Sequence, residues 1–96
     1  MTAYVLSPAA QASLRSIKSW SVERFGKEIT TAYLNKLRQK MSELSIQPES
    51  GTARPEIKKG YYSVFVGSHT IYYRIEEARI EVIDILRQRM DPEFHL

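Results

Sequence analysis

The chain has 96 residues, of which 14 are Lys or Arg and 11 are Asp or Glu, giving a formal net charge of +3. This length allows one domain with a modest hydrophobic core, and the absence of cysteine excludes disulfide scaffolds and Cys-based zinc sites. No segment approaches the ~20 consecutive apolar residues of a membrane-spanning helix, and none resembles a leader peptide. We therefore expect one soluble domain over residues 1–96, in the cytoplasm, whose charge permits acidic partners without identifying one.

The N-terminal part predicts a short strand followed by an amphipathic helix. The apolar stretch YVL stops at Ser7-Pro8, where serine can cap the free amides of a helix and proline suits its first turn. From Pro8 to Phe25 apolar residues recur every three or four positions, and Gly26 follows as a favourable helix end. The residues of this stripe are Ala10, Leu14, Ile17 and either Ser21 or Val22.

A second amphipathic helix is predicted directly after Gly26. Its apolar positions are spaced by three, four and three residues, and the helix ends before Pro48 and Gly51. Two such helices with so short a link pack as an antiparallel hairpin, whose apolar stripe needs a cover. The apolar positions are Leu34, Leu37, Met41 and Leu44.

The C-terminal half predicts three strands after a connecting loop over residues 47–59. Residues 61–66 and 69–76 are separated by Gly67-Ser68, which suits a type II′ hairpin turn. Residues 79–86 are apolar on both faces, as expected of a central strand or one with a bulge. In residues 70–76 one face should meet the helices, and the face with Thr70 and Tyr72 should be wetter. We predict an α+β domain of order β-α-α-β-β-β, a helical hairpin on a small, mainly antiparallel sheet.

The residues offer little for catalysis. His69 and His95 are too few for a histidine metal site, and no phosphate-binding glycine loop or Ser-His-Asp order occurs, so we expect no metal, no cofactor and no catalytic residue. His69 suits a strand entry that bonds the local backbone. The remaining polar groups are basic and aromatic; they could position phosphates and stack bases, or simply fill and solvate the rim of the core. They are Arg54, Lys58, Lys59, Tyr61, Tyr62, Tyr72, Arg74, Arg87 and Arg89.

Several segments in this order resemble the ParE branch of the ParE/RelE superfamily, the toxins of type II toxin–antitoxin modules. They are YVLSPAAQASL, QPESGTARPEI with Gly51-x-x-Arg54, IYYRIE, and VIDILRQRMD with Arg89-Met90-Asp91. The resemblance implies a helical hairpin on a small sheet. It also implies a non-enzymatic toxin that poisons DNA gyrase and is neutralised, in a hetero-oligomer, by a ParD-like antitoxin whose disordered C-terminal part folds onto it.

The RelE-like branch offers an alternative, a ribosome-dependent mRNA endoribonuclease. Such enzymes stabilise the developing phosphate charge with basic residues and often use a C-terminal tyrosine as acid or base. Here the chain ends Phe94-His95-Leu96, so that tyrosine is absent, and Arg74 and His95 are the candidates that remain.

We assign two sets of binding residues as predictions. Target binding is expected at Arg87, Arg89, Met90 and Asp91, with Lys58, Lys59 and Tyr61 as second choice. Antitoxin binding is expected at Trp20, Phe25, Tyr33 and Leu37. In the alternative interpretation Met90 packs against the helices, Asp91 caps a helix or pairs with an arginine, and Trp20 belongs to the core.

Overall fold

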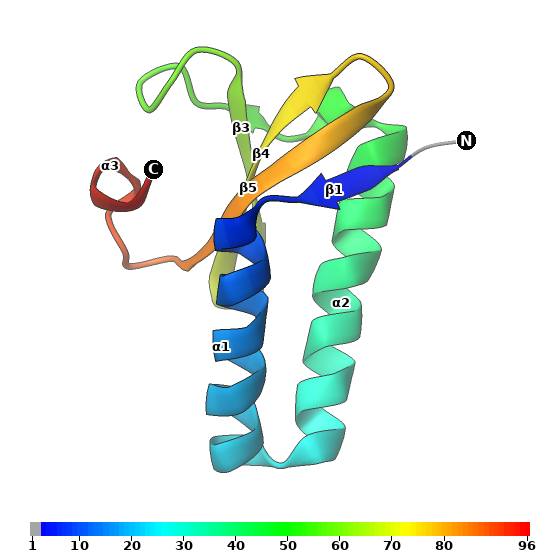
Figure 1. The fold of residues 1–96 in the computed structure, drawn as a ribbon, viewed down its shortest axis with the longest axis vertical. Helices are drawn as coiled ribbons and strands as arrows, with labels where there is room; N and C mark the ends of the chain where they lie inside the picture. The colour runs from blue at the N-terminus through cyan, green and yellow to red at the C-terminus, as the bar shows by residue number, and fades with distance from the viewer. Residues whose placement is uncertain (1–2) are drawn as a thin grey trace.

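A computed structural model describes residues 3–96 and confirms the α+β architecture (Figure 1). The segments β-α-α-β-β-β were predicted, whereas η1, β2 and α3 were not. None of the described helices is both long and apolar enough to cross a bilayer. The elements are β1 (Tyr4–Leu6), α1 (Pro8–Phe25), α2 (Lys27–Ile46), the 3-10 turn η1 (Pro48–Ser50), β2 (Thr52–Ala53), β3 (Tyr61–Val66), β4 (His69–Glu76), β5 (Arg79–Arg87) and α3 (Pro92–His95).

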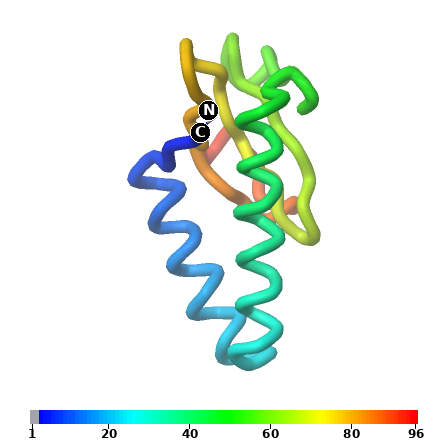
Figure 2. The backbone as a smooth tube through the Cα atoms, turned by 90° about the vertical axis from the view of Figure 1, so that its right-hand side faces the viewer, coloured from blue at the N-terminus to red at the C-terminus, as the bar shows by residue number. Residues whose placement is uncertain are grey.

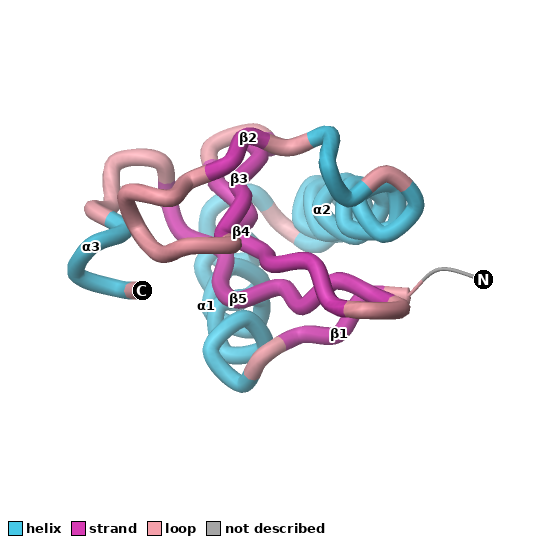
Figure 3. Tube along the Cα trace, turned by 90° about the horizontal axis from the view of Figure 1, so that it is seen from above, coloured by secondary structure: helices cyan, strands magenta, loops and turns pink. Residues whose placement is uncertain are grey.

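The five strands form one sheet in the order β1-β5-β4-β3-β2, with β1 parallel to β5 and the other pairs antiparallel. Figure 3 shows β1 and β2 at opposite ends of the row of strands. Tyr72 lies opposite Asp84 while Tyr73 lies opposite Val82, so Ile83 is an extra residue in β5. The prediction of a central strand or a bulged one therefore holds in both parts, because β5 is an inner strand that carries a β-bulge.

Local chemistry sets the ends of the two long helices. Ser7 Oγ accepts a hydrogen bond from the Ala10 amide at 3.0 Å, as predicted for a helix cap, and donates one to the Ile83 carbonyl of β5. Gly26 alone separates α1 from α2 and makes the antiparallel hairpin. Its far end, which we call the hairpin tip (residues 20–29), extends beyond the sheet (Figures 1 and 2).

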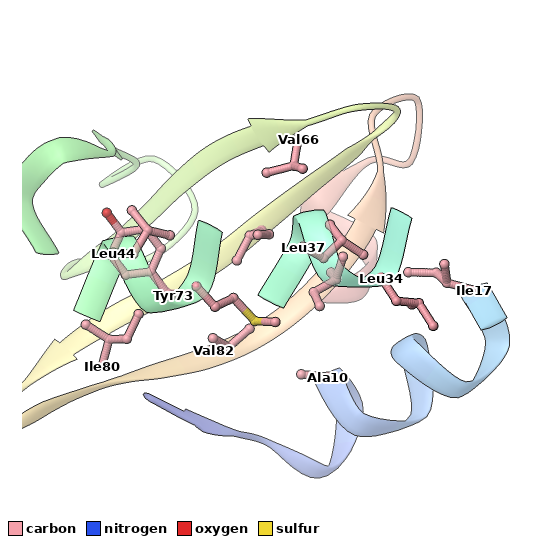
Figure 4. Close-up of a cluster of buried hydrophobic side chains, with 12 residues drawn as sticks. Ala10, Ile17, Leu34, Leu37, Leu44, Val66, Tyr73, Ile80 and Val82 are labelled. Carbon is pink, nitrogen blue, oxygen red and sulfur yellow. The ribbon is translucent and has the colours of Figure 1, made fainter. Parts of the chain in front are cut away.

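The core lies between the hairpin and one face of the sheet (Figure 4). Leu37, Met41 and Leu44 of α2 are fully buried against strand residues such as Tyr73 and Val82. Burial of such side chains contributes about 1.5–3 kcal/mol each, which makes this contact the main source of stability. The full cluster is Ala10, Ile17, Leu34, Leu37, Met41, Leu44, Val66, Ile71, Tyr73, Ile80, Val82 and Ile85.

The opposite face of β4 is drier than the alternation predicted. Thr70 and Tyr72 are only 2% and 4% exposed, although Arg74 on the same face is exposed. The guanidinium of Arg54 lies 5.8 Å from the centroid of the Tyr72 ring, so the loop after β2 folds back over this part of the sheet. The expectation of a wet face was wrong at Thr70 and Tyr72, and for Tyr72 the reason is the covering loop, which cannot be placed from strand periodicity.

The β3–β4 turn has the backbone that its sequence predicts. Gly67 has φ +57° and no described residue other than glycine has positive φ, as a type II′ turn requires. A Cβ at this position would also lie 2.6 Å from Cε1 of Tyr33. The glycine therefore serves both the turn and the close approach of α2.

Candidate functional site

The hairpin tip carries apolar side chains that the sheet does not cover. Trp20, Phe25 and Ile29 are 38%, 53% and 58% exposed. The rings of Trp20 and Phe25 meet edge to face with centroids 5.9 Å apart. Trp20 is therefore a surface residue and not part of the core, so the alternative interpretation of this tryptophan is wrong.

The other two predicted antitoxin residues are placed differently. Tyr33 is half-buried, and its hydroxyl lies 2.6 Å from Nδ1 of His69, donates to the Val66 carbonyl and accepts from the Ser68 amide, both at 3.2 Å. Leu37 is 0% exposed in the core, where no partner can reach it in this conformation. Its position on the apolar stripe was read correctly, but that part of the stripe faces the strands.

Two arginines converge on Trp20. The guanidinium carbons of Arg24 and Arg87 lie 4.7 and 5.0 Å from the centroid of its ring, within cation–π range. Arg24 was not among the predicted residues, although its i,i+4 spacing from Trp20 on a helix was a usable signal. The contact of Arg87 with Trp20 joins β5 to α1 and had no such local signal.

The segment after β5 forms an exposed end of the molecule. Arg87 and Arg89 are exposed and Met90 is 37% exposed. Asp91 Oδ1 accepts a hydrogen bond from the Glu93 amide at 2.9 Å and so caps α3. The capping role that we gave as an alternative for Asp91 is thus confirmed.

Two clefts meet around Trp20 and His69. The first, of about 290 Å³, runs along α1 and includes Ser13, Asp84, Met90 and His95. The second, of about 380 Å³, we call the Trp20–Arg89 cleft; it is lined by Trp20, Ser68, His69, Arg87, Gln88 and Arg89. Burial, and then the positive charge of Arg87, lower the pKa of His69 below its usual 6.5.

The second-choice target residues belong to a separate loop. Lys58 Nζ lies 5.9 Å from the centroid of the Tyr61 ring, and Lys58 and Lys59 are exposed. Arg54 shapes this loop, since its amide donates to the Tyr61 carbonyl at 2.7 Å and its side chain binds Glu56 and Ser63. The hydrogen bond with Glu56 raises the pKa of Arg54.

The residues of the ribonuclease alternative do not share a cleft. Arg74 is bound to Glu81 and Glu76 at 2.7 and 3.2 Å. His95 lines the cleft along α1, which does not include Arg74. In residues 3–96 no group of three or more metal-binding side chains comes together.

Comparison with known proteins decides the family. The profile described as "ParE toxin of type II toxin-antitoxin system, parDE" matches residues 4–92. The chain belongs to the ParE toxin family. Toxin ParE1 of Mycobacterium tuberculosis (strain ATCC 25618 / H37Rv) is 39% identical over 94 residues, covering 97% of this chain and 96% of that protein. Toxin ParE1 of Caulobacter vibrioides is 32% identical over 96 residues, covering 100% and 99% of the two chains.

A solved structure supports the fold of this ParE toxin. The structure named "Chromosomal ParDE TA system from P. aeruginosa" superimposes with a TM-score of 0.77 and covers 91% of this chain and 96% of its own. At 19% identity this likeness concerns the fold alone. The family match and the two relatives confirm the resemblance to ParE that the sequence predicted over nearly the whole chain.

Proposed function

We propose that this ParE toxin inhibits DNA gyrase and is neutralised by a ParD-like antitoxin within a hetero-oligomer. The observation that carries the proposal is the family match over residues 4–92, because the resemblance to ParE implies both partners. The toxin acts in the cytoplasm as a binding protein without cofactor or catalytic residue.

We place the target surface at the exposed end of β5 and on the segment that follows it. Arg87 and Arg89 form no ion pair within residues 3–96, whereas Arg54, Arg74 and Arg79 each pair with a glutamate. Unpaired cations beside the partly exposed Met90 give a surface that can bind a negatively charged, partly apolar partner such as gyrase with its bound DNA. Asp91 supports it by capping α3, and the loop with Lys58, Lys59 and Tyr61 is the second choice.

We place the antitoxin surface on the hairpin tip, around Trp20 and Phe25, with Tyr33 at its edge. Large exposed aromatic residues are frequent anchors of protein interfaces. An amphipathic segment that folds on binding can cover this apolar surface, and the burial of apolar area offsets the conformational entropy that the segment loses. Leu37 is left out because it is buried.

The ribonuclease alternative is less favoured by the geometry. Two glutamates offset the charge of Arg74, and the cleft that includes His95 does not include Arg74. An acid–base mechanism needs its groups within hydrogen-bond reach of one substrate.

The deciding experiment compares purified protein in two assays, gyrase supercoiling and cleavage of plasmid DNA, and cell-free translation of a reporter mRNA. Inhibition of gyrase with translation intact is the expected result, and Arg89→Ala should weaken it. Arg38→Ala on α2 is the matched control, because Arg38 is an exposed arginine outside the proposed surface. Translation arrest with gyrase untouched would contradict the proposal.

A second experiment tests the antitoxin surface with the ParD-like protein of the same operon. Phe25→Asp should abolish or greatly weaken binding measured by calorimetry. Ile46→Asp is its control, since Ile46 is equally apolar and 64% exposed, but lies at the other end of α2. Equal loss in both variants would show that the tip has no special role.

A further inference from the structure

The Trp20–Arg89 cleft differs in its charge from the other described clefts, three of which include a carboxylate while a fourth has a single arginine that is paired with Glu56. Among its lining residues two are arginines, one is histidine, and none is a carboxylate. Neither arginine is paired with an acid within residues 3–96. The lining of the cleft therefore carries a local excess of positive charge, although Asp84 lies in the adjoining cleft.

The donors of this cleft come from two segments that the fold holds together. His69 lies opposite Arg87 in the β4–β5 register, and the Gln88 amide donates to the Ser68 carbonyl at 3.1 Å. Gln88 Nε2 also donates to the Gly67 carbonyl at 2.9 Å. The turn after β3 and the end of β5 are thus held together, which keeps Ser68, His69 and Arg87 next to one another in the cleft.

His69 offers one ring nitrogen to the cleft. Its Nδ1 is occupied by Tyr33 at 2.6 Å, whereas no hydrogen bond to Nε2 is found within residues 3–96. Within residues 3–96 the only fully buried side-chain nitrogen or oxygen without a hydrogen bond is Thr30 Oγ1. Nε2 of His69 has no partner and is not among such atoms, so solvent reaches it although the residue is only 7% exposed. This edge can donate to an anion when the ring is protonated, and the lowered pKa of His69 restricts that contribution to acidic pH, so the two arginines carry the site at neutral pH.

Trp20 orders Arg87, one of the two arginines of the cleft, whose guanidinium lies over the indole. A guanidinium that lies over an indole loses less conformational freedom when it binds a ligand, because its plane is already held. The indole keeps 38% of its surface exposed, which leaves room for a sugar or base beside a bound phosphate.

We infer that the Trp20–Arg89 cleft binds a phosphodiester group of a nucleic acid strand. Arg87 and Arg89 bring two guanidinium groups, each with several N–H donors, to one cleft, and together they can bind the several oxygens of a phosphate. An aromatic ring beside arginines also matches single-strand binding, in which bases stack while cations hold the backbone. Asp84 lines the neighbouring cleft together with Arg87, where its Oδ1 accepts hydrogen bonds from Ser13 Oγ and the Ile85 amide, and it forms no ion pair with either cleft arginine.

The inference extends the proposed function, because the substrate of gyrase is DNA, yet its test needs no gyrase. The probes are oligothymidylate and oligouridylate strands about ten nucleotides long, within the size that single-strand sites cover. The chain has one tryptophan, so intrinsic fluorescence reports directly on this cleft, and anisotropy of a labelled strand gives the affinity. If the protein binds strands but does not inhibit gyrase, only the proposed function fails. If it inhibits gyrase but binds no strand, only the phosphodiester inference fails.

The variants are Arg87→Gln and Arg89→Gln, with Arg38→Gln as control for the same loss of charge. Each cleft variant should weaken binding more than the control and reduce the slope of log affinity against log salt by about 0.7, the value for one phosphate contact on a single strand. Circular dichroism checks the fold, and the exposed Arg89 keeps the test valid if Arg87→Gln is unstable.

Three results would overturn the inference. They are absence of strand binding at low salt, equal effects of the cleft variants and Arg38→Gln, or displacement of the strand by oligoglutamate at the same charge concentration. The last would assign the cleft to an acidic protein segment. Binding of either strand supports the phosphodiester site, and the stronger of the two identifies DNA or RNA as its source.

Discussion

Tyr73 and Gly51 test how the segment after α2 is attached to the sheet. Tyr73 is fully buried, and its hydroxyl donates to the Pro48 carbonyl at 2.6 Å and accepts from the Gly51 amide at 3.1 Å. Tyr73→Phe removes both bonds. At about 0.5–1.5 kcal/mol each, the free energy of unfolding should fall by about 1–3 kcal/mol.

Gly51 is needed here because of close approach, since its φ of −78° suits any residue. A Cβ would collide with Oη of Tyr73 and lie 3.0 Å from the Ser63 carbonyl oxygen. Gly51→Ala should therefore cost about 1–3 kcal/mol, the usual range for an overpacked site. In the Tyr73→Phe background the nearest atom is gone, so the same substitution should cost about 1 kcal/mol less.

Urea unfolding of the four proteins, followed by circular dichroism, measures this cycle. With a slope of about 1.5 kcal/mol per molar, a loss of 2 kcal/mol moves the midpoint by roughly 1.3 M. Two results would refute the reasoning: a cost of Tyr73→Phe below about 0.5 kcal/mol, or single effects that add to within about 0.3–0.5 kcal/mol in the double variant.

Three further predictions follow from the same contacts. Leu37→Ala should destabilise the fold by about 2–5 kcal/mol, while Phe25→Ala stays within about 0.5 kcal/mol, as thermal unfolding can show; equal costs would contradict the division between core and tip. Ser7→Ala should cost about 1–2 kcal/mol in urea because the cap is lost, and an unchanged midpoint would contradict the capping role. Burial and Arg87 lower the pKa of His69, so just below pH 6.5 the unfolded state binds more protons than the folded state. The contribution of His69 to the free energy of unfolding should therefore be complete above pH 6.5 and decrease as the pH falls towards the folded pKa. His69→Gln should remove this part of the pH dependence, and an unchanged slope would contradict it.

Where structure depends on neighbours in the chain, the sequence predicted it well. Ser7-Pro8 marks the start of α1, and Gly67-Ser68 marks the turn between β3 and β4. The missed elements are short and depend on distant partners. Strand β2 has two residues and pairs with Ser63 and Tyr62 of β3, and α3 is a single turn held by its Asp91 cap. Such segments lack the length over which a periodic pattern can be recognised.

The candidate site was harder to predict, because exposure depends on where the sheet ends. Leu37 and Trp20 both lie on long amphipathic helices, yet Leu37 is buried against the strands, whereas Trp20 meets only the end of β5 through Arg87 and stays 38% exposed. The same holds for the arginines. Arg54 pairs with Glu56 two residues away, a contact that local spacing can indicate, whereas Arg87 reaches Trp20 only because β5 runs beside α1. A small domain whose two helices extend past its sheet thus exposes an indole next to unpaired arginines. The antitoxin proposal rests on the indole, and the target and phosphodiester proposals rest on the arginines.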